Sequence, residues 1–172
     1  AYLLAGGSPY RTAWCPGYFQ VAPGLKLKCN VSWGHGTVDM REALMVSCNV
    51  YFYQLARELR YDNLYKAARA FGYGRPTGIA AMEKGESAGV LKNPQEQAAK
   101  YMGNRVMMGI GQGELISVTP MQQAMAYAAV ANGGTLYTPR LVRKILLPDQ
   151  TEIEKPPIVA GTLPISESQR RI

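Results

Sequence analysis

The stretch DMREALMVSCNVYFY, residues 39–53, predicts two helices that meet at Ser-Cys-Asn. Asp39 with Glu42 three residues later has the pattern of a capping box, so a short helix is expected to begin here. From residue 49 onward the apolar residues recur at helical spacing, which predicts a second helix with a buried face. Ser47 and Asn49 therefore lie at a helix junction, where such residues taken alone are most often caps.

Upstream of this stretch, residues 1–38 are rich in Gly, Pro and aromatic residues and predict irregular structure with short strands at most. The chain's three cysteines and its single histidine fall within residues 15–48. Three thiolates and one imidazole make a closed tetrahedral zinc set, and a segment with little periodicity would gain order from a metal clamp. The expected ligands of this structural zinc are Cys15, Cys29, His35 and Cys48.

A second interpretation of the same residues needs no metal. Cys15 and Cys29 would form a disulfide, as suits an oxidising compartment. Cys48 would then be a small buried residue and His35 a loop residue. The spacing of the four residues is not that of a zinc finger, so both interpretations stay open at this point.

Downstream, residues 62–71 predict a further helix, which glycines end, and residues 74–95 predict a loop. Thr119-Pro120-Met121-Gln122 combines an N-cap, a proline at the first helical position and a box-closing Gln, so a helix is expected there. The remaining expectations, in chain order, are one or two helical turns at 95–103, a glycine-rich turn at 109–113, a strand or hairpin arm at 137–147, loop at 148–164 and a helix start at 165–172. These elements divide the chain into an irregular segment at 1–38, a helical lobe at 39–134, and strand and loop at 135–172.

The composition limits the classes of function. The chain has 172 residues, enough for one domain or part of one, and 47% of them are hydrophobic. Its formal net charge is +7, but the basic residues are scattered and follow no nucleic-acid-binding motif, so we expect no nucleic-acid partner. No apolar run approaches the ~20 residues that a membrane-spanning helix needs.

Four motifs together resemble one family. Residues 34–53, around Ser47-Cys48-Asn49, are similar to the stretch around the second catalytic motif of the penicillin-binding protein transpeptidases, most closely those of the elongation type, penicillin-binding protein 2. The other matching segments, in chain order, are Phe71-Gly72-Tyr73-Gly74 with Thr77-Gly78-Ile79, Gly109-Ile110-Gly111-Gln112-Gly113 with Thr119-Pro120-Met121-Gln122, and Asn132-Gly133-Gly134 with Pro139. The resemblance covers roughly residues 13 to 145.

This resemblance implies a mixed α/β (α+β) transpeptidase fold, like that of serine β-lactamases, with this chain supplying mainly the helical lobe and short strands. It implies a serine D,D-transpeptidase that cross-links peptidoglycan stem peptides through an acyl-enzyme and binds β-lactam antibiotics. Ser47 would relay a proton, and Asn49 would orient the general-base lysine and the substrate amide. Gln112 could face the cleft, although a turn-building role is the alternative.

The resemblance also implies partners and a location. Elongation-complex membrane proteins, among them a glycosyltransferase, would be its partners at the periplasmic face of the bacterial inner membrane. No catalytic cofactor is expected, and a structural zinc fits the metal ligands that relatives have beside the second motif.

The sequence departs from the family at two motifs. No serine is followed three residues later by lysine, and no lysine begins K-T-G or K-S-G. We therefore expect an interior fragment that holds one of three catalytic motifs, with the nucleophile before it, the KTG strand and the membrane anchor outside it, and no activity alone. Two alternatives remain: a catalytically inactive scaffold domain of the same fold, and a small structural zinc-binding helical module.

Overall fold

The structure is a computed structural model that describes residues 1–79, 85–166 and 169. It divides the chain into two compact units. Unit 1 is built from Ala1–Ala68 and Leu91–Ser117, and unit 2 from Arg69–Val90 and the described residues from Val118 on. This division cuts across residues 39–134, which the sequence grouped as one helical lobe.

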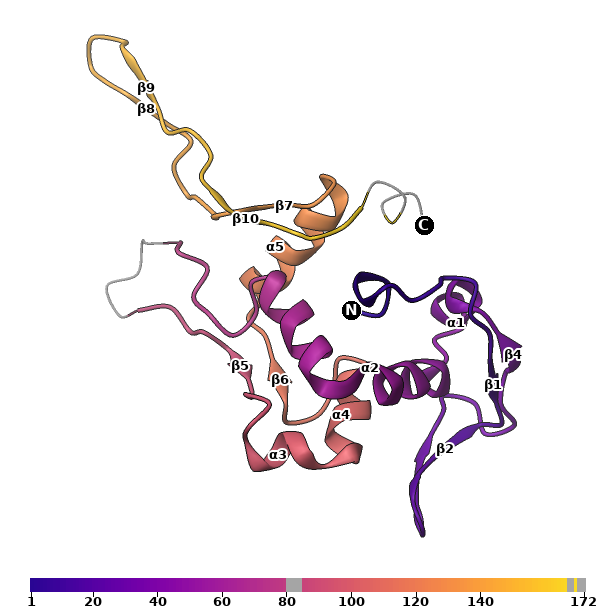
Figure 1. Cartoon of the computed structure of the whole chain (residues 1–172). Coiled ribbons are helices and arrows are strands. Elements are labelled where there is room, and N and C mark those ends of the chain that lie inside the picture. Colours follow the sequence, from indigo (N-terminus) through magenta and orange to yellow (C-terminus); the bar gives the residue numbers. More distant parts are fainter. Residues whose placement is uncertain (80–84, 167–168, 170–172) are drawn as a thin grey trace. The chain divides into compact units, whose positions relative to one another are not determined.

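The N-terminal segment of unit 1 contains short strands joined by irregular connections, as its glycines and prolines predicted. After a 3₁₀ turn, η1 (Leu3–Ala5), strand β1 (Ala13–Cys15) pairs antiparallel with β4 (Gly36–Val38), as Figure 1 shows. Strands β2 (Tyr18–Ala22) and β3 (Leu25–Lys28) form a hairpin. The backbone at Gly34 passes close to the end of β1. A Cβ on Gly34 would lie 2.1 Å from the Cys15 carbonyl oxygen, so only glycine fits there.

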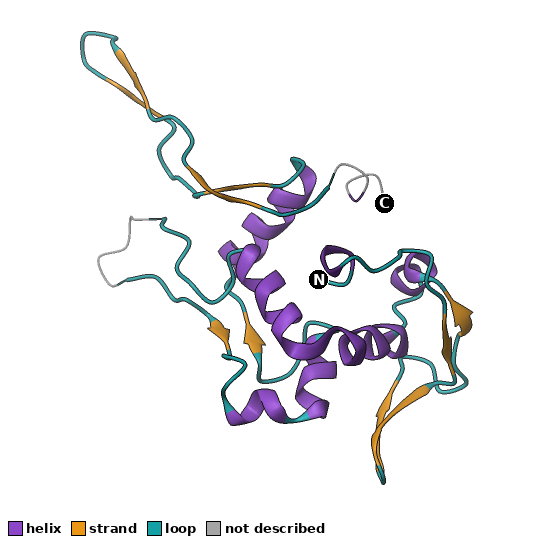
Figure 2. Ribbon diagram, viewed as in Figure 1, coloured by secondary structure: helices purple, strands orange, loops and turns teal. Residues whose placement is uncertain are grey.

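The helices of unit 1 follow the expected pattern. Helix α1 (Met40–Met45) begins at the Asp39–Glu42 capping box, whose two reciprocal hydrogen bonds are both present. Helix α2 (Asn49–Ala70) is broken at Arg60, whose φ of 60° and ψ of 148° are not helical, so the two helices expected here are present and meet at a kink. Figure 2 shows α2 as a helix with a bend, and its first half buries Val50, Tyr51, Tyr53, Leu55 and Ala56. Helix α3 (Gln97–Lys100) lies within the helical turns expected at 95–103, whereas α4 (Met102–Met108) extends beyond them to residue 108.

Unit 2 is organised around one helix and a pair of strands. Helix α5 (Pro120–Ala131) has the expected capping box of Thr119 and Gln122 and the proline in its first turn. Strands β7 (Thr135–Tyr137) and β10 (Val159–Thr162) pair antiparallel beside it. The core of this unit consists of Ala129, Leu136 and Leu163, with partly buried Ala70, Phe71, Met125 and Ile165 packed against them.

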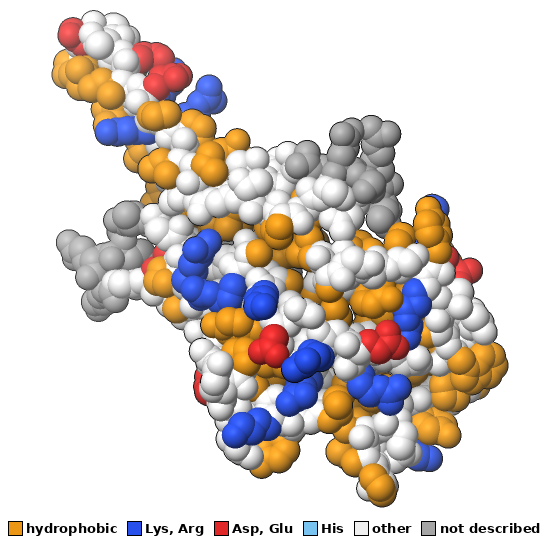
Figure 3. Space-filling model, viewed as in Figure 1, with side chains coloured by type: hydrophobic (Ala, Val, Ile, Leu, Met, Phe, Trp, Pro, Cys, Tyr) orange, Lys and Arg blue, Asp and Glu red, His pale blue; other side chains and the backbone are white. Residues whose placement is uncertain are grey.

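The expectation of loop at 148–164 is wrong, because β9 (Glu152–Glu154) and β10 both lie there. Strand β9 pairs with β8 (Lys144–Leu146), in the hairpin arm that the sequence placed at 137–147. Neither strand is long enough to show periodicity, so the pairing depends on the partner strand rather than on a local pattern. This hairpin carries exposed apolar side chains (Figure 3), including Ile145, Leu146 and Ile153.

Two short strands complete the described elements, β5 (Val90–Leu91) and β6 (Ile116–Ser117). β5 lies in the stretch 74–95 that was expected to be loop. The helix expected at 165–172 falls largely outside the described residues. Within the described residues, none of the helices combines the length and the apolar character that crossing a bilayer would require.

Candidate active-site hollow and metal centre

The Ser47-Cys48-Asn49 turn connects α1 to α2. The Ser47 N–H donates to the Leu44 carbonyl at 3.3 Å, and the Cys48 N–H donates to the Ala43 carbonyl at 2.8 Å. Ser47 itself has φ 53°, in the left-handed region that non-glycine residues seldom occupy. Such a conformation costs about 1–3 kcal/mol and persists where the surrounding structure imposes it. The strained residue is exposed.

A hollow of about 300 Å³ opens at this turn. Ser47 and Asn49 both line it, so the two residues that the sequence assigned to a cleft are brought together at a surface that solvent reaches. The other lining residues are Leu44, Phe52, Gly109 and Ile110. Sequence reasoning missed Leu44, Phe52 and Ile110 as lining residues. Of these three, only Ile110 could have been found from a sequence pattern, because it lies between the first two glycines of the 109–113 turn.

Gly109 lets this glycine-rich turn approach α2. A Cβ at Gly109 would lie 2.5 Å from the Cβ of Ala56 and 3.0 Å from the Phe52 carbonyl oxygen. Gly109 and Ile110 therefore reach the hollow because residue 109 has no side chain. Gln112 is exposed and is not among the lining residues, and its N–H donates to the Met107 carbonyl at 3.0 Å. This position suits the turn-building alternative for Gln112.

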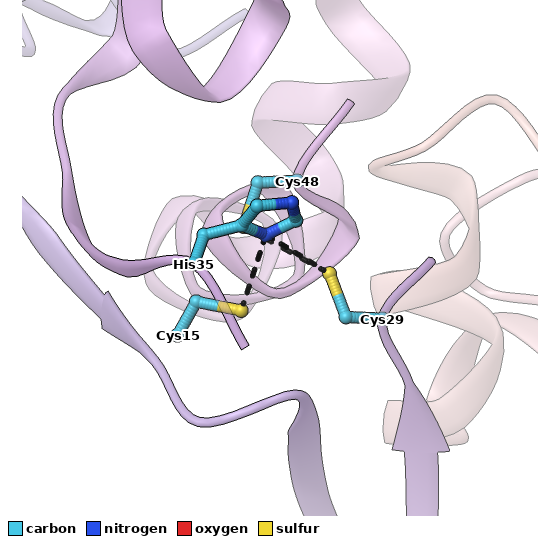
Figure 4. Close-up of side chains that lie close together, drawn as sticks. All are labelled: Cys15, Cys29, His35 and Cys48. Carbon is cyan, nitrogen blue, oxygen red and sulfur yellow. Dashed lines mark hydrogen bonds between the residues drawn. The ribbon is translucent and has the colours of Figure 1, made fainter. Parts of the chain in front are cut away.

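The four expected metal ligands converge in unit 1 (Figure 4). Cys15 lies at the end of β1, Cys29 just after β3, His35 just before β4, and Cys48 at the turn before α2. Their ligand atoms all lie within 4.8 Å of one another, and all three cysteines are free thiols. The sequence therefore identified the whole cluster, although the four residues come from separate segments.

Three of the six distances between ligand atoms in this cluster can be compared with those around a tetrahedral ion. With Zn–S bonds of about 2.3 Å and Zn–N bonds of about 2.05 Å, tetrahedral ligands lie about 3.8 Å apart for two sulfurs and about 3.5 Å apart for sulfur and nitrogen. The Cys29 and Cys48 sulfurs are 4.0 Å apart. His35 Nδ1 lies 3.6 Å from the Cys15 sulfur and 3.5 Å from that of Cys29. The residues present thus fit zinc, with Nδ1 as the nitrogen ligand.

Burial distinguishes the thiols. Cys15 and Cys48 are buried and Cys29 is half-buried. Burial raises the pKa of the Cys48 thiol to about 12, and the nearby Cys15 and Cys29 act in the same direction. Burial also acts to raise the pKa of Cys29, but hydrogen bonds from the Val50 backbone and other groups outweigh it, and the pKa is lowered. A bound cation would favour the thiolate at each position.

The hollow and the cysteine cluster share one turn. Cys48 is the middle residue between Ser47 and Asn49, so its thiol points into the cluster while its neighbours line the hollow. A second link comes from Asn30, next to Cys29, whose amide donates to the Val46 carbonyl at 3.1 Å. Ser47 is therefore held on one side by Cys48 in the cluster and on the other by the hydrogen bond from Asn30 to Val46.

The comparisons with known proteins agree with this geometry. The family model for the penicillin binding protein transpeptidase domain matches residues 16–171. The peptidoglycan D,D-transpeptidase MrdA of Acinetobacter baumannii is 38% identical over 136 residues, which is 74% of this chain and 20% of that protein. The chain thus spans about one-fifth of the length of this curated relative.

Solved structures match over nearly the whole chain. The imipenem acyl-enzyme complex of penicillin-binding protein A from M. tuberculosis has a TM-score of 0.80 and 26% identity, and covers 98% of this chain and 38% of its own. Penicillin-binding protein 2 of Helicobacter pylori, in complex with MreC, has a TM-score of 0.73 and 23% identity over 95% of this chain and 29% of its own, a likeness of fold. The expected mixed α/β transpeptidase fold is confirmed, and the chain belongs to the family of penicillin binding protein transpeptidase domains, with relatives of the penicillin-binding protein 2 type.

Proposed function

We propose that this chain supplies the second catalytic motif and part of the cleft of a serine D,D-transpeptidase that cross-links peptidoglycan. The observation that carries the proposal is the placement of Ser47 and Asn49 on one solvent-open hollow beside the glycine-rich turn. Family membership supports it, as does the relative named a peptidoglycan D,D-transpeptidase.

In this reaction a serine outside these 172 residues attacks the carbonyl between the two D-Ala residues of a stem peptide. The terminal D-Ala leaves with a proton, and an amine of a neighbouring strand then takes the acyl group from the serine. Ser47 carries a hydroxyl at the hollow, suited to relaying the proton between the general-base lysine and the reacting groups. Asn49 carries an amide beside it, suited to orienting that lysine and the substrate amide. A β-lactam would acylate the same serine, and the imipenem acyl-enzyme complex of the M. tuberculosis neighbour supports this.

The proposal extends to location and partners. The protein acts at the periplasmic face of the bacterial inner membrane, on peptidoglycan stem peptides. Its partners are membrane proteins of the elongation complex, including the glycosyltransferase that makes the strands. The likeness in fold to a penicillin-binding protein 2 in complex with MreC is compatible with such an assembly.

The test is acylation by a fluorescent penicillin, using the product of the whole reading frame that encodes this chain. Ser47→Ala should slow labelling by about 100-fold or more, the usual effect of losing a positioned acid–base group. Ser32→Ala, at another exposed serine of unit 1, is the matched control and should label at the wild-type rate. A protein that never labels would favour the scaffold alternative, and normal labelling of Ser47→Ala would remove the relay role.

We also propose that Cys15, Cys29, His35 and Cys48 hold a structural zinc ion, as the fit of their distances to a tetrahedron supports. The ion would supply no chemistry to the acyl transfer. These residues would clamp the strands of residues 13–38 to the turn before α2. In the competing interpretation, a Cys15–Cys29 disulfide would leave Cys48 and His35 without a shared role.

Metal analysis of the purified protein should find about one zinc per chain. His35→Ala should lose most of it, while Thr37→Ala, at an exposed neighbouring position on β4, should keep it. Zinc-free protein with a Cys15–Cys29 bond in its peptides would overturn the metal site and leave the transpeptidase proposal untouched.

A further inference from the structure

Two thiols of the cysteine cluster are placed for oxidation to each other. The sulfurs of Cys29 and Cys48 lie 4.0 Å apart, and a disulfide needs about 2.05 Å. Cys29 is the least buried of the three thiols, since Cys15 is 1% exposed and Cys48 is fully buried. The buried thiol of Cys48 is in turn close enough to react with a modified Cys29.

We propose that Cys29 and Cys48 form an oxidisable dithiol, and that their disulfide expels the metal and displaces Ser47 and Asn49. The effect on catalysis rests on the function proposed above, while the formation of the bond does not. The disulfide is a different pair from the Cys15–Cys29 bond considered from the sequence.

The oxidant is a small or protein disulfide, R–S–S–R. The Cys29 thiolate attacks one sulfur of this disulfide, forms the mixed disulfide and releases one thiolate, RS⁻. The Cys48 thiolate then attacks the Cys29 sulfur and releases the second RS⁻. Two cysteine thiols are oxidised, and one external disulfide is reduced to two thiols. The protons of the cysteines pass to the two leaving thiolates. If the thiols hold a metal ion at the start, the ion leaves with its charge unchanged and solvent supplies these protons.

We expect closing the bond to pull on the turn that lines the hollow. The two sulfurs have to approach by about 2 Å. Cys48 is held by its N–H bond to Ala43, and Cys29 by an N–H bond of 2.8 Å to the Gly17 carbonyl. The residue after Cys29 is bonded to the Val46 carbonyl, and Cys48 directly follows Ser47. The displacement therefore falls on Val46 and Cys48, the two neighbours of Ser47. Ser47 is already in a strained conformation. Losing two of four ligands also removes the closed coordination set.

The test begins with the location of the disulfide. Full-length protein is prepared reduced and zinc-loaded, exposed to oxidised glutathione, alkylated and digested with trypsin. The three cysteines fall in different tryptic peptides, 12–26, 29–41 and 42–57. The expected result is a 29–41 peptide linked to 42–57, with one zinc per chain released to a chromogenic chelator, both reversed by dithiothreitol and rebinding of zinc. A dominant link through peptide 12–26, or unlinked peptides after zinc release, would overturn the proposal.

Two variants sharpen the result. Cys15→Ser keeps the reacting pair and should still give the 29–41 to 42–57 link. Cys29→Ser should give no such link, and its labelling by fluorescent penicillin should have the same rate before and after oxidation. Wild-type labelling should fall by about 100-fold on oxidation and recover on reduction with zinc. Unchanged wild-type labelling despite a complete link would overturn the displacement of Ser47.

The two proposals fail in different ways. Reduced, zinc-loaded protein that never labels contradicts the transpeptidase function, yet the peptide link and zinc release still decide whether the dithiol exists. A protein that labels normally when reduced, and that lacks the link after oxidation, retains the function and loses the dithiol.

Discussion

The amide of Asn30 donates a 3.1 Å hydrogen bond to the carbonyl of Val46, the residue before Ser47. Asn30→Ala removes this bond, whose net contribution is about 1 kcal/mol. Because the bond holds the strained turn, we expect fluorescent-penicillin labelling to slow by several-fold with a small change in the midpoint of thermal unfolding. Labelling kinetics and calorimetry of the full-length protein measure the two effects.

Asn30→Asp separates this hydrogen bond from the metal site. Aspartate has nearly the same size and shape as Asn30, which is not a proposed metal ligand, but it has no amide to donate to the Val46 carbonyl. It should therefore label as slowly as Asn30→Ala while retaining its zinc. Wild-type labelling by Asn30→Asp would show that the contact with Val46 does not position Ser47.

The second prediction concerns the close packing at Gly109. Gly109→Ala places a methyl group 2.5 Å from the Cβ of Ala56, so the glycine-rich turn must shift away from α2. Overpacking of this kind typically costs about 1–3 kcal/mol, and the shift should also slow labelling because residues 109 and 110 line the hollow. The midpoint of urea unfolding and the labelling rate are the measurements.

The matched control is Gly103→Ala in α4, where an added Cβ meets nothing within 4 Å. Alanine in a helix is favoured over glycine by up to about 1 kcal/mol, so this variant should be neutral or stabilised. Ala56→Gly carries its own helix cost, so the double variant Ala56→Gly with Gly109→Ala should lose less stability than the sum of the two single variants. A Gly109→Ala protein as stable as Gly103→Ala would show that the turn does not pack closely on α2.

Local rules in the sequence predicted the helix starts well. Asp39 with Glu42, and Thr119 with Gln122, are patterns in which side chain and backbone satisfy each other within four residues, so no tertiary contact is needed. The cysteine cluster was also predictable, because a metal site is limited to few residue types and the chain has only three cysteines and one histidine.

Features that depend on distant partners were not predictable in this way. The β8–β9 pairing brings together strands of three residues each, too short to show a period. The contribution of Leu44 and Phe52 to the hollow depends on where α1 and α2 meet, and both look like ordinary apolar helix residues. The strained φ of Ser47 likewise follows from its surroundings, because serine has no preference for that conformation.

Gln122 carries a third prediction, because its role extends beyond the capping box. Its side-chain oxygen accepts from the Thr119 N–H at 2.9 Å, and its amide donates to the carbonyls of Arg75 at 2.7 Å and Ala88 at 2.9 Å. The residue is 1% exposed. Gln122→Met keeps the approximate size but leaves these groups without partners, which should cost about 3 kcal/mol in the free energy of unfolding.

The neighbouring Gln123 provides the control. It is half-buried and accepts one hydrogen bond, from the Tyr73 hydroxyl at 2.9 Å. Gln123→Met should therefore cost about 1 kcal/mol. Urea unfolding of both variants, followed by circular dichroism, makes the comparison, and equal losses would contradict the bridging role of Gln122 in unit 2.

The last prediction is a pH dependence that comes from Glu86. Its carboxylate accepts from the Thr77 hydroxyl at 2.5 Å and from the Gly78 N–H at 3.0 Å. The Thr77 hydroxyl bond, followed by the backbone N–H groups, lowers the pKa of Glu86 below its ordinary value of 4.5. A group whose pKa is lower in the folded state contributes stability above its unfolded pKa. That contribution is lost as the pH falls through the folded pKa.

Glu86→Gln should therefore lower the midpoint of urea unfolding at neutral pH, where the wild-type carboxylate is charged in both states. The difference between the two proteins should shrink as the pH falls below 4.5, because the wild-type side chain becomes neutral as well. Thr77→Val removes the main cause of the lowered pKa and should reduce the same pH-dependent difference. A difference between wild type and Glu86→Gln that stays constant from neutral to acidic pH would show that these hydrogen bonds do not favour the charged carboxylate.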